Sequence, residues 1–196
     1  MLDAPGLVTA LQKIQPSQYN RNVYRCVELA ALIGDGTRKI QLLYDLGPRL
    51  SGQRYTAKGG ARAIYVSEHP DTSYVEATGM FSSVAALSQQ NALAQGSYQV
   101  NVNLSAILDI TLGTNQKILE TNTIELTRSW EWQMAMDLPV PTQILGEVAF
   151  ASGRFQAIRF PSARRGDQVN LVIWTERILA PSFIEVTDPN YPQRIP

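Results

Sequence analysis

The chain has 196 residues, of which 44% are hydrophobic and 17% charged, which excludes a disordered or fibrous protein and allows one domain with a real core. Its 17 Lys and Arg balance 17 Asp and Glu, so no basic excess predicts direct binding to nucleic acid or to a membrane surface. Because Cys26 is the single cysteine and no apolar stretch approaches the ~18 residues of a membrane span, we expect a cytoplasmic protein without disulfides.

The first half of the chain alternates short predicted elements with glycine-rich connections. Residues 5–14 predict a helix, preceded by an early acid that is not typical of a signal peptide. Residues 22–29 (NVYRCVEL) have the composition of a strand, and the stretch from there to Gly60 reads as long irregular connections. A strand at 61–68 (ARAIYVSE) precedes a helix that begins near residues 71–73.

The second half predicts more strands than helices. Residues 96–110 alternate apolar and polar side chains at period two, which indicates a strand. Trp130 and Trp132 are expected in the core on one strand face. Two prolines then announce a helix that Gly153 ends. Two late strands joined by a polar turn precede an irregular, proline-rich tail; they are expected at 154–162 and 170–178.

This order of elements predicts an α+β fold built on a mostly antiparallel sheet with flanking short helices. We see no internal repeat, no low-complexity block and no linker between two domains. We therefore expect one domain over residues 1–196, with its core at about 20–180 and an extension at each end.

Several familiar kinds of site are missing from the sequence. There is no phosphate-binding P-loop and no glycine fingerprint of a dinucleotide-binding fold. One histidine and one cysteine cannot build a usual zinc site, so we expect no metal. His69 stands beside a proline at an expected helix start, where a surface or capping role is favoured over catalysis. The chemistry must then come from Arg, Glu, Ser and Tyr.

Two arginines are candidates for binding an anion. Arg25 lies inside an apolar strand and needs a partner, because an unpaired buried charge is costly. It either forms an internal salt bridge, for example to Glu76 or Asp45, or binds a phosphate, whose oxygens match a guanidinium two at a time. Arg54 lies among glycines, which let a backbone approach a ligand closely.

Two further residues, Tyr65 and Glu76, each have a structural and a functional interpretation, and a third, Ser162, has a structural one. Tyr65 is either core or a platform for a flat heterocycle. Glu76 either closes a capping box with Ser73, in the pattern S-x-x-E, or acts as a catalytic carboxylate. Ser162 follows a strand beside a proline and, taken alone, is a turn residue.

Four segments of this sequence resemble the RES-domain family, named for its Arg, Glu and Ser. They are YR at residues 24–25, GQRYTAKGGARAIYVSEHPDTSYVE, PTQILGEVAFASG, and IRFPSARRGDQVNLVIW. The resemblance spans about residues 23–174. It departs from the family pattern at Gln53, Tyr55 and Thr56, where the family has Gly, Trp and Asn.

The resemblance implies an ADP-ribosyltransferase-like fold, with NAD in the cleft of a twisted, split sheet. It implies a toxin of a bacterial toxin–antitoxin pair, and it assigns roles to five residues. Glu76 would act on the ribose, Arg25 and Arg54 would neutralise the pyrophosphate, Tyr65 would frame the nicotinamide end, and Ser162 would fix the ribose or nicotinamide. Glu76, Arg54 and Ser162 are the expected catalytic residues.

The family leaves the acceptor open. NAD would be the substrate of a glycohydrolase or phosphorylase; the alternatives are an ADP-ribosyltransferase that modifies a protein, a non-catalytic module that binds a nucleotide or a partner, and a plain structural protein. A small cognate antitoxin that blocks the cleft is the expected protein partner. A homo-oligomer stays open.

Overall fold

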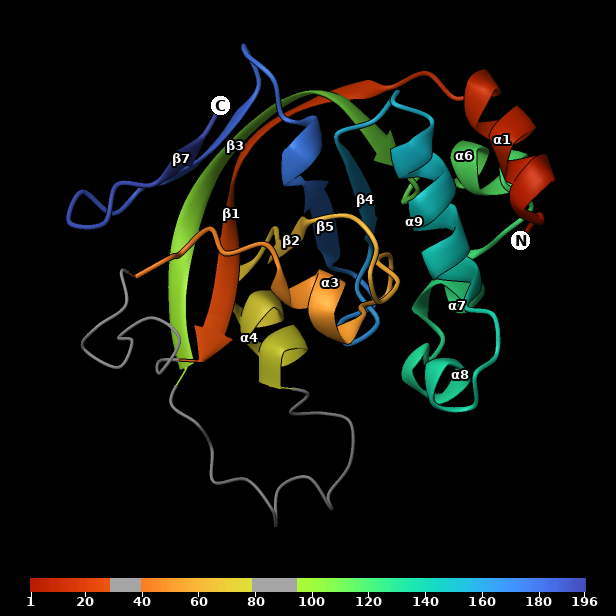
Figure 1. Ribbon diagram of the computed structural model, residues 1–196, viewed down its shortest axis with the longest axis horizontal. Coiled ribbons are helices and arrows are strands. Elements are labelled where there is room, and N and C mark those ends of the chain that lie inside the picture. Colours follow the sequence, from red (N-terminus) through yellow and green to blue (C-terminus); the bar gives the residue numbers. More distant parts are fainter. Residues whose placement is uncertain (29–39, 79–94) are drawn as a thin grey trace.

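A computed structural model describes residues 1–28, 40–78 and 95–196 of the chain. It confirms the expected α+β class, with a seven-stranded sheet and several short helices among the described residues (Figure 1). The strands are β1 (Ser17–Glu28), β2 (Ala63–Ser67), β3 (Gln95–Asp109), β4 (Ala157–Pro161), β5 (Val169–Trp174), β6 (Phe183–Val186) and β7 (Arg194–Ile195).

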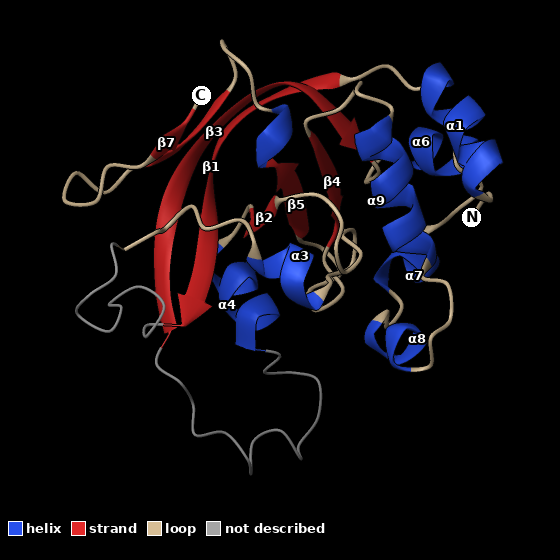
Figure 2. Ribbon diagram, in the orientation of Figure 1, coloured by secondary structure: helices blue, strands red, loops and turns tan. Residues whose placement is uncertain are grey.

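The helices form two groups around the sheet. One group lies together at one end of the molecule, and α3 and α4 lie beside the ends of β1 and β2 (Figure 2). The first group contains α1 (Ala4–Lys13), α6 (Gly113–Ile118), α7 (Thr123–Thr127), α8 (Glu131–Ala135) and α9 (Pro141–Ala151). The second contains α3 (Gly47–Ser51) and α4 (Pro70–Thr78).

The sheet closes on itself through its two longest strands. Its order is β1-β2-β5-β4-β3-β6-β7, and β1 also pairs with β3, so five of the strands form a ring. The pairing of β3 with β4 is parallel, and the others are antiparallel. The mostly antiparallel sheet expected from the sequence is present.

The ring is weakest between β1 and β2, which pair only at Tyr24 and Ser67. Continued antiparallel pairing would bring residues 25–27 opposite residues 64–66, but the described residues show no such pairs. β1 instead follows β3 as far as Glu28. The two strands therefore part just after Tyr24, and this opening positions the site.

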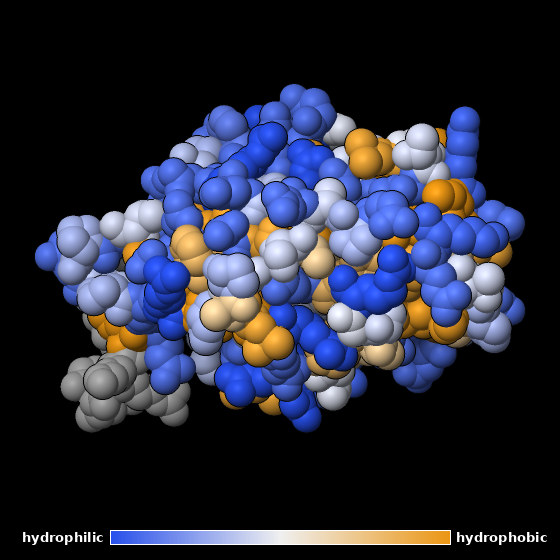
Figure 3. Space-filling view, turned by 90° about the horizontal axis from the view of Figure 1, so that it is seen from above, coloured by the Kyte–Doolittle hydropathy of each residue, from blue (hydrophilic) through white to orange (hydrophobic). Residues whose placement is uncertain are grey.

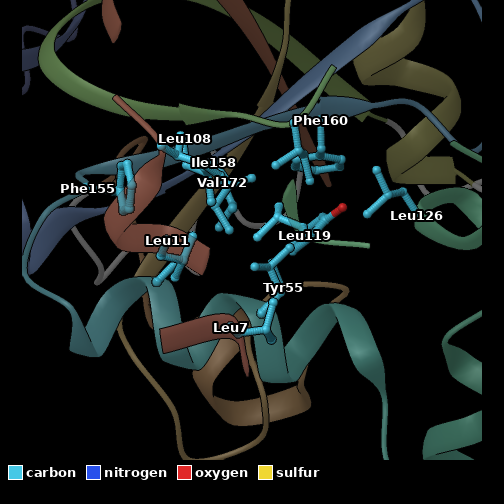
Figure 4. Close-up of a cluster of buried hydrophobic side chains, with 14 of the residues drawn as sticks. Leu7, Leu11, Tyr55, Leu108, Leu119, Leu126, Phe155, Ile158, Phe160 and Val172 are labelled. Carbon is cyan, nitrogen blue, oxygen red and sulfur yellow. The ribbon is translucent and has the colours of Figure 1, made fainter. Parts of the chain in front are cut away.

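Strands β2, β4 and β5 are buried on both faces, which explains their nearly continuous apolar sequence. Alternate side chains point to opposite sides of a strand, so Ile173 packs toward β1 and β3 while Val172 packs toward the helices. Figure 4 shows the buried cluster on the helix side, which contains Leu7 and Leu11 of α1 together with Val172, Ile158 and Leu108 of the sheet.

The predicted helix at residues 5–14 is α1, and the helix announced by the prolines is α9. The Asp3 side chain accepts a hydrogen bond from the N–H of Gly6 at 2.9 Å and caps α1. Beyond α9, Gly153 has φ +68°, the left-handed conformation that suits a helix end at glycine.

Several expectations were wrong. Trp130 and Trp132 do not lie on a strand, since Glu131–Ala135 form α8 and Trp132 is 60% exposed. The tail is not wholly irregular, because β7 pairs with β6 and the sheet continues beyond residue 180. The stretch to Gly60 includes helix α3, although its residues 29–39 lie outside the described part.

The face seen in Figure 3 is mostly hydrophilic, with apolar side chains in small scattered groups. Within the described segments, every helix is too short or too polar to cross a membrane. The same segments contain no group of three or more His, Cys, Asp or Glu side chains suited to a metal ion.

Candidate active site

A cavity of about 380 Å³ opens where β1 and β2 part, a volume within the range of small-molecule sites. Its walls come from β1, β2, α3, α4 and the start of α8, with single residues of β4 and β5. Four of the five residues predicted from the sequence line this cavity: Arg25, Arg54, Tyr65 and Glu76. Ser162 is not among the lining residues, but its hydroxyl donates a hydrogen bond to Glu76.

Arg25 projects from β1, and backbone oxygens hold its guanidinium. Its two terminal nitrogens donate to the carbonyl of Leu42 at 2.9 Å and to that of Tyr44 at 2.6 Å. The suggested salt bridge to Glu76 or Asp45 is wrong, because within the described chain no carboxylate lies within 4.0 Å of it. Burial lowers the pKa of the Arg25 guanidinium, as expected for a cation without a paired anion.

The carbonyls that hold Arg25 are fixed from the far end of the chain. Gln193, just before β7, accepts a hydrogen bond from the N–H of Leu43 at 3.0 Å and donates to the carbonyl of Ile40 at 2.6 Å. Tyr98 of β3 also donates to the Leu42 carbonyl. The segment whose carbonyls hold Arg25 is thus fixed both by β3 and by the residue that precedes β7.

Arg54 occupies a tight turn between α3 and β2. Gln53 and Thr56 exchange backbone hydrogen bonds of 2.7 and 3.1 Å across this turn. One terminal nitrogen of Arg54 donates to the carbonyls of Leu126 at 2.9 Å and Arg128 at 2.7 Å, at the end of α7. The remaining N–H groups of the guanidinium make no hydrogen bond to the described residues, so they can receive an anion.

The turn is anchored by the two tyrosines next to it. The Tyr55 ring is 1% exposed and packs on Phe160 with ring centroids 4.5 Å apart. The Tyr65 hydroxyl accepts a hydrogen bond from the N–H of Tyr55 at 3.0 Å and lies 3.1 Å from the Thr56 hydroxyl. Tyr65 therefore lines the cavity and also supports the turn that carries Arg54.

Glu76 points from α4 toward β5. Its Oε1 atom accepts hydrogen bonds from the Ser162 hydroxyl at 2.6 Å and from the Asn170 amide at 2.8 Å. The capping-box interpretation with Ser73 is wrong, because α4 begins at Pro70 and Ser73 lies inside it. His69 performs the expected capping role, since its Nδ1 accepts from the N–H of Asp71 at 3.3 Å.

Ser162 is 1% exposed, at the end of β4. Its hydroxyl oxygen accepts hydrogen bonds from the N–H groups of Arg164 at 3.1 Å and Arg165 at 3.0 Å. The sequence predicted that Ser162 contacts the ribose or nicotinamide; in this structure its hydroxyl contacts Glu76.

Sequence reasoning missed several polar residues that line the cavity, among them Glu131, Arg164, Ser67 and Asn170. The Ser67 hydroxyl donates to the Asn170 side chain at 2.6 Å. The signal for Asn170 was its place at the start of the apolar run LVIW, where an amide must find buried partners.

Comparison with known proteins agrees with this description. A family model described as "RES domain" matches residues 23–193. A chain of the crystal structure of the M. tuberculosis MbcT-MbcA toxin-antitoxin complex is similar in fold, with a TM-score of 0.70 at 18% sequence identity. That match covers 97% of this chain and 91% of the other. No curated protein sequence matches the chain.

Proposed function

The chain belongs to the RES-domain family, and we propose that it is an NAD-consuming enzyme that breaks the bond between nicotinamide and ribose. The observation that carries this proposal is the shared cavity, whose lining brings together the guanidinium groups of Arg25 and Arg54 and the carboxylate of Glu76. The twisted, split sheet of ADP-ribosyltransferase-like folds agrees with the way in which β1 and β2 part at this cavity.

The two arginines suit the pyrophosphate of NAD. Neither Arg25 nor Arg54 is neutralised by a carboxylate in the described structure, and both are held by backbone carbonyls. An arginine that is fixed in this way has lost its conformational freedom before the ligand arrives, which favours binding. Guanidinium groups also bind phosphate oxygens in pairs.

Glu76 suits the other end of the substrate. Loss of nicotinamide leaves positive charge on the ribose, as in glycoside hydrolysis, and a fixed carboxylate stabilises that charge. In this scheme Glu76 holds a ribose hydroxyl and orients the acceptor, while Tyr65 frames the nicotinamide end. With water as acceptor the products are ADP-ribose, nicotinamide and a proton; phosphate would replace the water in phosphorolysis.

We further propose that the chain is the toxin of a toxin–antitoxin pair and acts in the cytoplasm. Membership of the RES-domain family and the fold shared with a chain of a toxin-antitoxin complex support this. A cognate antitoxin would then cover the cavity mouth and exclude NAD.

The test is incubation of the purified protein with NAD labelled in its adenine, with and without phosphate. We expect nicotinamide release, together with labelled ADP-ribose or its phosphate, and loss of both in the Glu76→Ala variant. Label on a protein would instead identify an ADP-ribosyltransferase. NAD binding by calorimetry without turnover would identify a binding module, and neither binding nor turnover would overturn the proposal.

A further inference from the structure

We propose that Asn170 is a positioning residue that holds the Glu76 carboxylate by one oxygen and leaves its other oxygen for the substrate. This inference rests on the proposed function, because it concerns the same carboxylate. It assigns Asn170 and its partner Ser67 a role that the motifs named for Arg, Glu and Ser do not include.

Both hydrogen bonds to Glu76 end on the same atom. The Asn170 amide nitrogen and the Ser162 hydroxyl lie 2.8 and 2.6 Å from Oε1. Among the described residues, no donor lies within hydrogen-bond distance of Oε2. Glu76 lines the cavity, so the oxygen that the protein leaves unbonded is the one available to a ribose hydroxyl or a water molecule.

The direction of each hydrogen bond is fixed by its neighbours. The Ser162 oxygen already accepts from two backbone N–H groups, so its own proton is given to Glu76. The Ser67 hydroxyl donates to the Asn170 side-chain oxygen at 2.6 Å, which turns the amide nitrogen toward Glu76.

The backbone determines where Asn170 stands. Ser67 and Asn170 are direct partners in the antiparallel pairing of β2 and β5. They are 3% and 5% exposed, so an unpaired polar atom at either residue would be costly. A shift of one residue in the pairing would turn Asn170 away from Glu76. The register of the sheet therefore sets the orientation of the carboxylate.

The test uses Asn170→Asp, which keeps the shape of the side chain but replaces the donor with a second negative charge. If Asn170 only fills space, the isosteric Asp is tolerated better than Ala. If it acts through Glu76, Asp is worse than Ala, because two carboxylates then face each other. We expect at least a 100-fold loss of kcat in Asn170→Asp, a smaller loss in Asn170→Ala, and little change in KM for NAD in either variant.

A second measurement does not depend on activity. Asn170→Asp should lower the urea midpoint of unfolding in the wild-type background, and this loss should be much smaller when Glu76→Gln is also present, because a neutral amide at position 76 removes the repulsion between the two carboxylates. The double variant should stay inactive, since the carboxylate is no longer at position 76. Asn101→Asp is the matched control: the Asn101 amide also donates across strands, but to the neutral Asn22.

The outcomes separate the two proposals. Rescue of the urea midpoint with no turnover by the wild type would support the Asn170–Glu76 contact and overturn the proposed function. If Asn170→Asp cost the same stability in the wild-type and the Glu76→Gln backgrounds, the positioning role would be overturned. So would Asn170→Asp with more activity than Asn170→Ala.

Discussion

The backbone of Gly146 lies against the carbonyl of Tyr55 so closely that a Cβ atom at position 146 would sit 2.0 Å from that oxygen. Gly146 is in the middle of α9, and Gln143, one turn earlier, donates to the carbonyl of Gln53 at 3.0 Å. Helix α9 is thus the surface on which the turn carrying Arg54 rests.

The variant Gly146→Ala is expected to destabilise the protein by about 3 kcal/mol or more, since overpacking against backbone cannot be relieved by a side-chain movement. It should also displace Arg54 and weaken NAD use. Urea unfolding and nicotinamide release measure the two effects. Gly113→Ala is the control, because a Cβ there meets nothing within 4 Å; equal stability of the two variants would contradict the contact.

The variant Arg54→Ala is expected to raise KM for NAD about 10- to 100-fold, because a hydrogen bond to a charged group contributes roughly 1.5–3 kcal/mol. The exposed Arg49 of α3 lies nearby and provides the control. Steady-state kinetics of Arg54→Ala and Arg49→Ala measure the difference, and equal KM values would argue against a specific phosphate contact.

The variant Tyr55→Phe is expected to stabilise the protein by about 1 kcal/mol, since its hydroxyl is buried without a partner among the described residues and removal ends that desolvation penalty. Burial also raises the pKa of Tyr55, so the hydroxyl that the substitution removes is uncharged at neutral pH. Tyr65→Phe provides the opposite case, because the Tyr65 hydroxyl bonds to Tyr55 and Thr56. Thermal unfolding should move the two midpoints in opposite directions; a shift of both the same way would refute this account.

Glu68 is expected to make stability depend on pH. Partial burial raises the pKa of Glu68, but the hydrogen bonds and charge of Arg159 outweigh it, so the net shift is downward. A lowered pKa in the folded state gives stability that is present above the unfolded value, near 4.5, and is lost as the pH falls below it.

Accordingly, Glu68→Gln should reduce stability by about 2 kcal/mol at pH 7 and flatten the acid side of the stability curve. Urea unfolding from pH 7 to pH 3 measures both. Glu185→Gln is the control, because the pair of Glu185 and Arg194 is exposed and contributes little. A slope as steep in Glu68→Gln as in the wild type would assign the acid sensitivity to other groups.

The sequence predicted best the elements with strong and continuous patterns. The apolar run of β5 and the period-two alternation of β3 need burial on a sheet, and few other structures accommodate them. The proline at the start of α9 and the glycine after it fixed both ends of that helix.

The elements that were missed are short and held by tertiary contacts. Helices α6, α7 and α8 have five or six residues each, too few to be stable alone or to show a helical period. Asn122 caps α7 through a hydrogen bond to the N–H of Glu125, but a single Asn is equally common in turns. Trp130 and Trp132 were assigned to a strand face because two residues are too few to distinguish the period of a strand from that of a helix.

Site residues that belong to a family motif could be predicted from the sequence. Hydrogen-bond partners that are backbone groups of distant segments could not. Arg25, Arg54 and Glu76 were found, whereas Glu131 and Arg164, which also line the cavity, were not. The partners of Arg25 are carbonyls of Leu42 and Tyr44, which any residue type could supply, so no side-chain pattern announces them. Asn170 depends on the register of β2 and β5, which a single sequence does not reveal.

The two hydrogen bonds of the Gln193 side chain link the carboxyl-terminal end of the described chain to the segment beside the cavity. Gln193, just before the last strand, bonds to a loop more than a hundred positions upstream, and two carbonyls of that loop hold the Arg25 guanidinium. Shortening or fusing the protein at its carboxyl end would therefore act as a change at the catalytic centre, although nothing was altered there.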